Sequence, residues 1–195
     1  MTRSEFIKSI SAFASVALVG GCGTLTCGKK EPKVLFVYFS QTGNTRFATE
    51  AMAATCPGAR VAEIKPAVPY AADAKAFGEE TKKELAGKAL RPIAKMDDLA
   101  LADYDLIFVG TPNWGGTLVP AVRTFLTENR DVLKTKTLCV YATFGGGGLQ
   151  NIAKDFESIV AGAQLLKPGA FKGATIKTDE TLKTFVAERR APTAV

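Results

Sequence analysis

The chain contains no histidine in its 195 residues. A Ser-His-Asp triad, a Cys-His nucleophile pair and the usual imidazole metal sites are therefore excluded. Its four cysteines form no CxxC pair, and without histidine a zinc site is not expected. Any chemistry must therefore come from carboxylates, hydroxyls, backbone groups or a cofactor.

The chain also lacks a long hydrophobic run and a concentrated patch of charge. Its apolar run from Ile10 to Val19 is too short to cross a bilayer as a mature helix. The net charge of +6 comes from scattered lysines and arginines, without a basic run that contains interleaved aromatic residues. Nucleic-acid binding is therefore not expected, although a basic protein can favour anionic partners or an anionic lipid surface.

The N-terminus has the features of an export signal. Arg3 and Lys8 supply positive charge ahead of the apolar run, and small residues end that run. We interpret residues 1–21 as a signal peptide and residues 22–32 as a tether.

Two short motifs bear on how the chain is exported. Val19-Gly20-Gly21-Cys22 resembles a bacterial lipobox, in which Cys22 would become the lipidated first residue. A plain signal peptide with an incidental cysteine is the alternative. Residues 2–8 resemble a twin-arginine signal whose second arginine is replaced by serine, so ordinary secretion is also open. We expect a lipid-anchored protein on the extracytoplasmic face of a bacterial cell envelope.

Residues 33–195 are predicted to form one α/β domain, because apolar runs of strand length alternate with helical patterns. Such connections require a parallel sheet with right-handed crossovers, which gives a three-layer α/β/α sandwich. Five strands are expected, at residues 34–39, 59–64, 104–110, 137–143 and 164–170. Helices are expected at residues 45–55, 73–90, 120–128, 150–162 and 179–190.

The loop after the first strand has the composition of a phosphate site. Ser40-Gln41-Thr42-Gly43-Asn44-Thr45 places hydroxyl and amide side chains around one glycine, where the free N–H groups of the next helix point. The loop contains no lysine, so neutral donors would hold a monophosphate rather than a triphosphate with Mg²⁺. A polar helix cap is the alternative, but a cap needs only one such residue.

Two further loops lie at the same predicted sheet edge, where open parallel sheets bind ligands. The loop from Thr111 to Leu118 carries Trp114, the sole tryptophan, followed by two glycines. An exposed tryptophan is a candidate for stacking on a flat ligand, and packing onto a neighbouring loop is the alternative. The loop from Thr143 to Leu149 contains four consecutive glycines, which allow close backbone approach or simple flexibility.

These residues resemble flavodoxin. The segment SQTGNT matches the family pattern [ST]-x-T-G-x-T, and PNWGG resembles the family loop that places a tryptophan on one flavin face. The resemblance covers nearly all of the chain from Lys33 onward. It implies a five-stranded parallel sheet of order 2-1-3-4-5 with FMN at the switch point.

The resemblance also implies a set of FMN-binding residues from the three loops. The phosphate would be held by Ser40, Gln41, Thr42, Gly43, Asn44 and Thr45. The ring would be lined by Thr111, Pro112, Asn113, Trp114, Gly115 and Gly116, with the tryptophan stacking. The other side of the ring or its pyrimidine edge would be covered by Thr143, Phe144, Gly145 and Gly146. No catalytic residue and no metal ligand is expected.

This chain departs from many flavodoxins in three respects. It is basic, its third loop has glycines where many have a tyrosine, and none of the three loops contains an acidic residue. Fewer negative charges near the ring should make the reduced, anionic ring easier to form. The lowest potential should therefore be less negative than in acidic relatives.

The leading hypothesis is a monomeric electron carrier whose partner is a redox protein or a small oxidant. An FMN-dependent reductase that oxidises NAD(P)H and reduces quinones is the alternative, and a non-redox binding module that kept the fold is the second. Cys56 and Cys139 are expected to be inert, because Cys139 lies within a strand pattern.

Overall fold

The computed structural model describes residues 31–190. The expected signal peptide, the lipidation site Cys22 and most of the tether lie outside these residues. The six strands of the described part are β1 (Val34–Tyr38), β2 (Arg60–Glu63), β3 (Leu106–Pro112), β4 (Thr137–Phe144), β5 (Gln164–Leu165) and β6 (Gly169–Lys172). Its α-helices are α2 (Asn44–Ala53), α3 (Ala74–Ala86), α4 (Pro120–Glu128), α5 (Arg130–Leu133), α6 (Ile152–Ile159) and α7 (Thr181–Arg190). Two 3₁₀-helices are η1 (Leu101–Asp103) and η2 (Gly173–Thr178).

The sheet is parallel and its strand order is β2-β1-β3-β4-β5, which confirms the predicted order 2-1-3-4-5. The predicted last strand, residues 164–170, is two strands instead, because β5 ends before Pro168 and β6 pairs with β4 further along. Proline has no N–H to donate to the ladder and interrupts an edge strand in this way.

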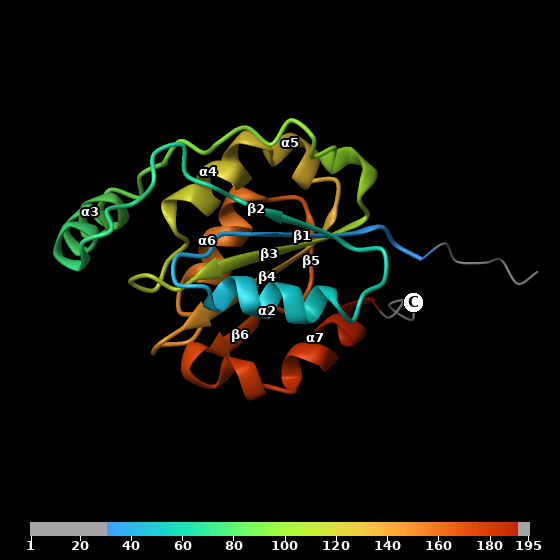
Figure 1. Cartoon of the computed structure of the whole chain (residues 1–195). Helices are drawn as coiled ribbons and strands as arrows, with labels where there is room; N and C mark the ends of the chain where they lie inside the picture. The colour runs from blue at the N-terminus through green and yellow to red at the C-terminus, as the bar shows by residue number, and fades with distance from the viewer. Residues whose placement is uncertain (1–30, 191–195) are drawn as a thin grey trace, which may run out of the picture. The chain divides into compact units, whose positions relative to one another are not determined.

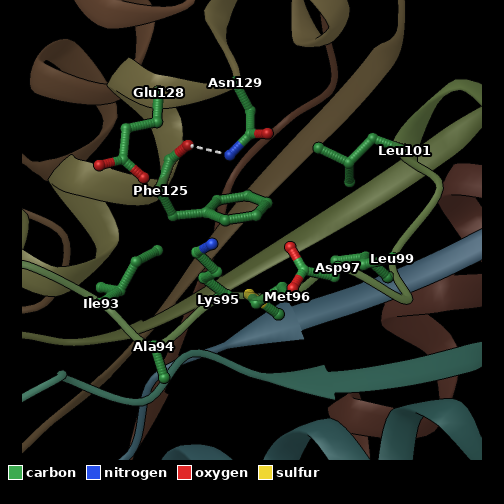
Figure 2. A pocket seen from close by; sticks show the side chains of 10 residues that line it. All are labelled: Ile93, Ala94, Lys95, Met96, Asp97, Leu99, Leu101, Phe125, Glu128 and Asn129. Atoms are coloured by element: carbon green, nitrogen blue, oxygen red, sulfur yellow. Dashed lines mark hydrogen bonds between the residues drawn. The ribbon is translucent and has the colours of Figure 1, made fainter.

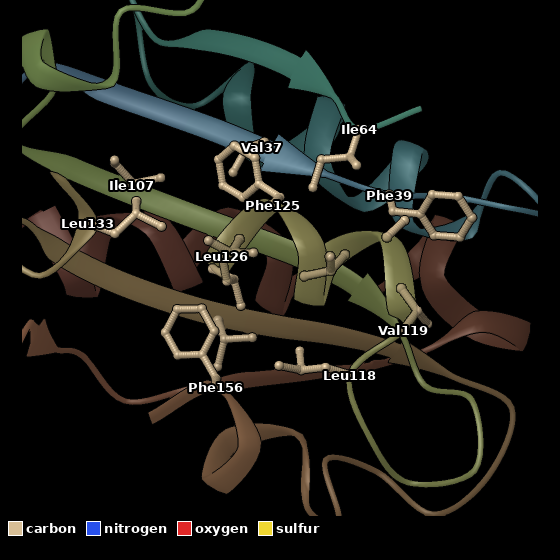
Figure 3. Packing of buried hydrophobic residues seen from close by; sticks show 14 of the residues in the cluster. Val37, Phe39, Ile64, Ile107, Leu118, Val119, Phe125, Leu126, Leu133 and Phe156 are labelled. Carbon is tan, nitrogen blue, oxygen red and sulfur yellow. The ribbon is translucent and has the colours of Figure 1, made fainter. Parts of the chain in front are cut away.

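Helices cover both faces of the sheet, as the three-layer prediction requires (Figure 1). On one face α4 and α6 pack over β1, β3 and β4 through a core that includes Leu126 and Phe156 (Figure 3). On the other face α2 and α7 pack against alternate strand residues such as Phe36 and Phe108. Alternate residues of β1 thus belong to different cores, which explains why the strand reads as a continuous apolar run.

Helix α3 is lightly packed, because only Thr81 of its 13 residues is buried. It is shorter than the predicted helix 73–90: Asp73 caps its start by accepting the N–H groups of Lys75 and Ala76, and the helix stops before Gly87. The prediction of a lightly packed surface helix is confirmed. In the described part of the chain, none of the helices combines the length and the apolar character needed to span a membrane.

Candidate functional site

The three loops singled out in the sequence meet at one edge of the sheet and bond to one another. They lie at the ends of β1, β3 and β4, and are called the first, second and third loops below. Thr111 and Pro112 are still part of β3, Thr143 and Phe144 of β4, and Asn44 and Thr45 already belong to α2. Asn113 of the second loop donates its backbone N–H to the Thr143 carbonyl, with the two atoms 2.8 Å apart. Its side-chain amide donates to the Gly148 carbonyl at 2.5 Å. The hydroxyl of Thr45 in the first loop lies 2.7 Å from that of Thr143. The predicted site residues are therefore neighbours.

The first loop leaves the start of α2 open to an anion. Gly43 precedes the helix in a left-handed conformation, with φ of 90°, and none of the side chains in the described residues caps the helix. The first intrahelical bond runs from Phe47 N–H to the Gly43 carbonyl, so the three preceding amides have no protein acceptor within residues 31–190. Free amides and the positive end of a helix together make an anion site. The donor set fits a phosphate group.

The second loop is shaped by its two glycines. Gly115 and Gly116 have positive φ values of 61° and 81°. The side-chain amide of Gln150 occupies the space that a Cβ atom at Gly116 would take. Asn113 closes the turn by accepting the Gly116 N–H at 2.8 Å. The positive φ angles and the Asn113 hydrogen bond thus define the turn that carries Trp114.

Trp114 packs edge-on against three other aromatic rings. Its ring centroid lies 5.5 Å from that of Phe39, 5.2 Å from Tyr70 and 5.1 Å from Phe77. The indole is half-buried, so it is more enclosed than its glycine-rich context predicts. The contacts agree with the alternative of packing onto neighbouring segments, and edge contacts of this kind also hold a ring in one orientation. These four residues are called the aromatic cluster below.

Two members of the aromatic cluster come from a segment that sequence analysis did not connect with the site. Residues 66–92 are called the α3 lobe. The two ends of this segment lie side by side, since the Ala67 N–H donates to the Pro92 carbonyl at 2.8 Å. In Figure 1, α3 lies beyond the edge at which β3 ends, away from the two helical layers. Phe77 of α3 contacts the indole, and Leu85 lies against Gly115. The lobe therefore covers one side of the second loop.

A buried arginine, Arg91, bonds to several groups within the α3 lobe. Arg91 is 7% exposed, and its guanidinium donates to Glu80 at 2.7 Å and to Glu84 at 2.6 Å. It also donates to the carbonyls of Val68 and Pro69. Its Cζ atom lies 3.7 Å from the centroid of the Tyr70 ring, a cation–π geometry. Arg91 is therefore placed beneath the aromatic cluster, a role that its position beside Pro92 did not indicate.

The third loop has open space around its first two glycines. A Cβ atom built at Gly145 or Gly146 would meet nothing within 4 Å, whereas one at Gly147 would meet the Gln150 side chain at 2.5 Å. Gly147 and Gly148 have positive φ, as has Gln150 itself. The first half of the loop is thus uncovered, and its second half is a tight turn.

Two acidic side chains near the loops are paired with basic ones. Glu63, at the end of β2, bonds Arg46 of α2 at 2.6 Å. Asp155 of α6 bonds the Thr117 hydroxyl and lies 3.8 Å from both Lys88 and Arg123. The three loops themselves contain hydroxyls, amides, glycines and aromatic rings, and no group that titrates near neutral pH. The site therefore offers hydrogen-bond donors and ring contacts rather than acid–base chemistry.

The two cysteines of the described residues lie away from these loops, in the core beneath α2 and α7. Cys56 and Cys139 are free thiols and both are buried. Burial raises the pKa of the Cys139 thiol to about 12, so it stays protonated at neutral pH. This agrees with the expectation that the thiols are inert.

Two hollows differ in their relation to the site. One of about 280 Å³ lies beside the first loop, between Ser40, Gln41 and the residues Lys65 to Tyr70. Another, of about 420 Å³, is formed by residues 93–101 and the end of α4, where Asn129 donates to the Phe125 carbonyl (Figure 2). None of the residues that line this second hollow belongs to the three loops, so we do not assign it to the site.

Comparison with known proteins places this geometry in a family. The family model described as flavodoxin matches residues 33–189. A candidate flavoprotein from Bacteroides uniformis is 27% identical, with a TM-score of 0.67, over 81% of this chain and 99% of that protein. One from Bacteroides eggerthii is 28% identical, with a TM-score of 0.63, over 75% of this chain and 94% of that protein. A flavoprotein from Lactobacillus acidophilus, solved in complex with FMN, shares the fold at 19% identity and a TM-score of 0.64, over 75% of this chain and 97% of that protein. The chain belongs to the flavodoxin family.

Proposed function

We propose that this protein binds FMN non-covalently at the three loops and passes electrons between partners. The observation that carries the proposal is the uncapped start of α2 next to the open glycines Gly145 and Gly146. The amides of α2 and the hydroxyls of the first loop would hold the phosphate. Trp114, with the second and third loops, would hold the ring. The flavin, when bound, supplies the reversible electron transfer, and the protein supplies orientation and electrostatics.

Electron carriage rather than turnover is supported by the chemistry of the loops. They contribute no general acid or base, and Gly145 and Gly146 are exposed. An exposed ring edge would let electrons reach a redox protein or a small oxidant.

Residues 31–190 contain 21 basic and 18 acidic residues, a balance of +3, so half of the net charge of +6 lies outside them. The net charge of the domain itself is therefore smaller than that of the full sequence, and its electrostatic preference for anionic partners is weaker.

The proposal is tested by titrating the purified full-length protein with FMN. We expect flavin absorption to shift and flavin fluorescence to be quenched. Trp114→Ala should weaken binding about tenfold through the lost ring contact. Thr42→Ala in the first loop should also weaken it, while Thr135→Ala, an exposed threonine before β4, should not.

A protein that leaves the spectrum of FMN unchanged would exclude the flavin function and favour the binding module. Steady oxidation of NAD(P)H with a quinone by the FMN-loaded protein would favour the reductase. If the protein is an electron carrier, we expect slow NAD(P)H turnover but rapid exchange of electrons with a chemical mediator.

We propose further that the protein is exported and anchored by a lipid on Cys22. The support is the basic start, the short apolar run and the small residues that precede Cys22. Expressed in a bacterial host, the full chain should sediment with the membranes and incorporate labelled fatty acid. Cys22→Ser should abolish the labelling, and Cys27→Ser should not. Equal labelling of the wild type and Cys22→Ser would contradict the anchor.

A further inference from the structure

Thr143, the next-to-last residue of β4, bonds to both of the other loops. Its hydroxyl lies 2.7 Å from the hydroxyl of Thr45, and its carbonyl accepts the Asn113 N–H at 2.8 Å. Thr143 is 4% exposed and Thr45 is 1% exposed. One buried residue thus joins the first, second and third loops.

The direction of the Thr143 side chain bears on its role. The family resemblance implied that Thr143 covers the other side of the ring or its pyrimidine edge. Its hydroxyl instead bonds the first turn of α2, in which Thr45 is the second residue. That turn carries the free amides described above. A buried hydroxyl pair is a directional contact, because each partner would lose its hydrogen bond if the turn moved.

We infer that Thr143 is a positioning residue for the phosphate of the cofactor, acting through Thr45 rather than by touching the ring. The inference rests on the proposed FMN function. The Thr143 hydroxyl fixes the first turn of α2 to the end of β4, so the amides are held where the phosphate lies. Small displacements of such donors weaken anion binding, because hydrogen bonds to a charged group depend on distance and angle.

A second set of hydrogen bonds limits how far α2 can move when the bond between Thr143 and Thr45 is lost. The Thr49 hydroxyl donates to the Thr45 carbonyl at 2.6 Å and also lies 2.6 Å from the hydroxyl of Tyr141 on β4. The next turn of α2 therefore stays attached to the same strand. Removing the Thr143 hydroxyl should loosen the first turn without detaching the helix.

The test compares FMN with riboflavin, which has the same ring but no phosphate. Full-length wild type and Thr143→Val are titrated with each flavin by fluorescence quenching. We expect Thr143→Val to bind FMN about fivefold more weakly and to bind riboflavin with less than a twofold change. Thr143→Ser keeps the hydroxyl and should restore FMN binding.

A double-mutant cycle shows whether Thr143 acts through Thr45. Thr45→Val removes the other half of the pair but keeps the backbone amide, so it should weaken FMN binding to a similar extent. The variant that carries both substitutions should be no weaker than either single one, because the same hydrogen bond is lost. Thr81→Val serves as the matched control, since this buried threonine of α3 bonds only its own helix. Circular dichroism checks that each variant is folded.

Three results would overturn the inference. If riboflavin binding falls as much as FMN binding, Thr143 contacts the ring. If the effects of Thr143→Val and Thr45→Val add, the two residues act separately. If FMN and riboflavin both bind Thr143→Val as tightly as they bind the wild type, the hydrogen bond between Thr143 and Thr45 has no role in binding. A wild type that binds neither flavin would refute the proposed function itself, which is a different outcome.

Discussion

Arg91→Met should lower the free energy of unfolding by about 3 kcal/mol, which is typical of removing one partner from a buried ion pair. The guanidinium bonds two carboxylates, Glu80 and Glu84, and two backbone carbonyls of the α3 lobe. Methionine fills much of the same space but donates no hydrogen bond. The carboxylates would face each other without a cation, and the lobe carbonyls would lose their donor.

The same substitution should change the environment of Trp114. Arg91 lies over Tyr70, and Tyr70 packs against the indole. Because Trp114 is the sole tryptophan, its fluorescence reports on the aromatic cluster alone. We expect a red-shifted emission maximum for folded Arg91→Met and a lower urea midpoint.

Arg60→Met is the matched control for Arg91→Met. Arg60 pairs with Asp98 on the surface, with side-chain exposures of 41% and 82%. Such pairs contribute at most about 1 kcal/mol, so this variant should remain close to the wild type. Equal losses in the two variants would contradict the role given to Arg91.

Low pH should weaken the ion pair between Arg91 and Glu80. The hydrogen bond from Arg91 and that from the Ala71 N–H hold the pKa of Glu80 below its usual range. A carboxylate whose pKa is lowered in the folded state stabilises that state above its unfolded pKa, and this contribution is lost as the pH falls through the lower, folded value. The wild type should therefore lose stability below about pH 4.5. Arg91→Met should lose less over the same interval, as urea titrations at several pH values would show.

Gly110→Ala should cost about 3 kcal/mol of folding free energy, at the upper end for an overpacked core. Gly110 lies between Tyr38 of β1 and Tyr141 of β4 in the register of the sheet. A Cβ atom there would lie 2.5 Å from both Cζ and the hydroxyl oxygen of Tyr141. The ring cannot easily yield, because Tyr141 is completely buried and its hydroxyl bonds Thr49.

Two variants test this explanation. Gly78→Ala in α3 meets no atom within 4 Å, so the same change should be neutral or stabilising there, since alanine is the better helix former. In a Tyr141→Leu background, Gly110→Ala should cost much less, because the ring it displaces is gone. An unchanged cost in that background, measured by urea unfolding, would show that the ring is not the obstacle.

The boundaries that the sequence failed to predict have local physical causes. The last strand divides at Pro168, whose missing N–H interrupts the ladder. Helix α3 ends at Ala86, before Gly87 and four residues before the predicted end at Leu90, although the expected stop signal, Arg91-Pro92, comes later. The short helices α5, η1 and η2 have too few residues for a periodic pattern to be visible.

The sequence by itself determined the fold class, the strand order through its family resemblance, and the three loops at one sheet edge. Apolar runs of strand length, helical spacing and turn residues are local signals, and each is readable within about ten residues. They are sufficient to place Ser40 to Thr45 and Trp114 on the same edge of the sheet.

Only the tertiary structure decided which side chains support those loops. Arg91 beneath Tyr70, Phe77 against Trp114, and Thr143 on Thr45 join segments that are distant in the chain. Such contacts depend on the directions of side chains in the folded packing, and no local pattern encodes them. The sequence therefore predicted where a ligand would bind, while the folded chain showed what holds the binding loops in place.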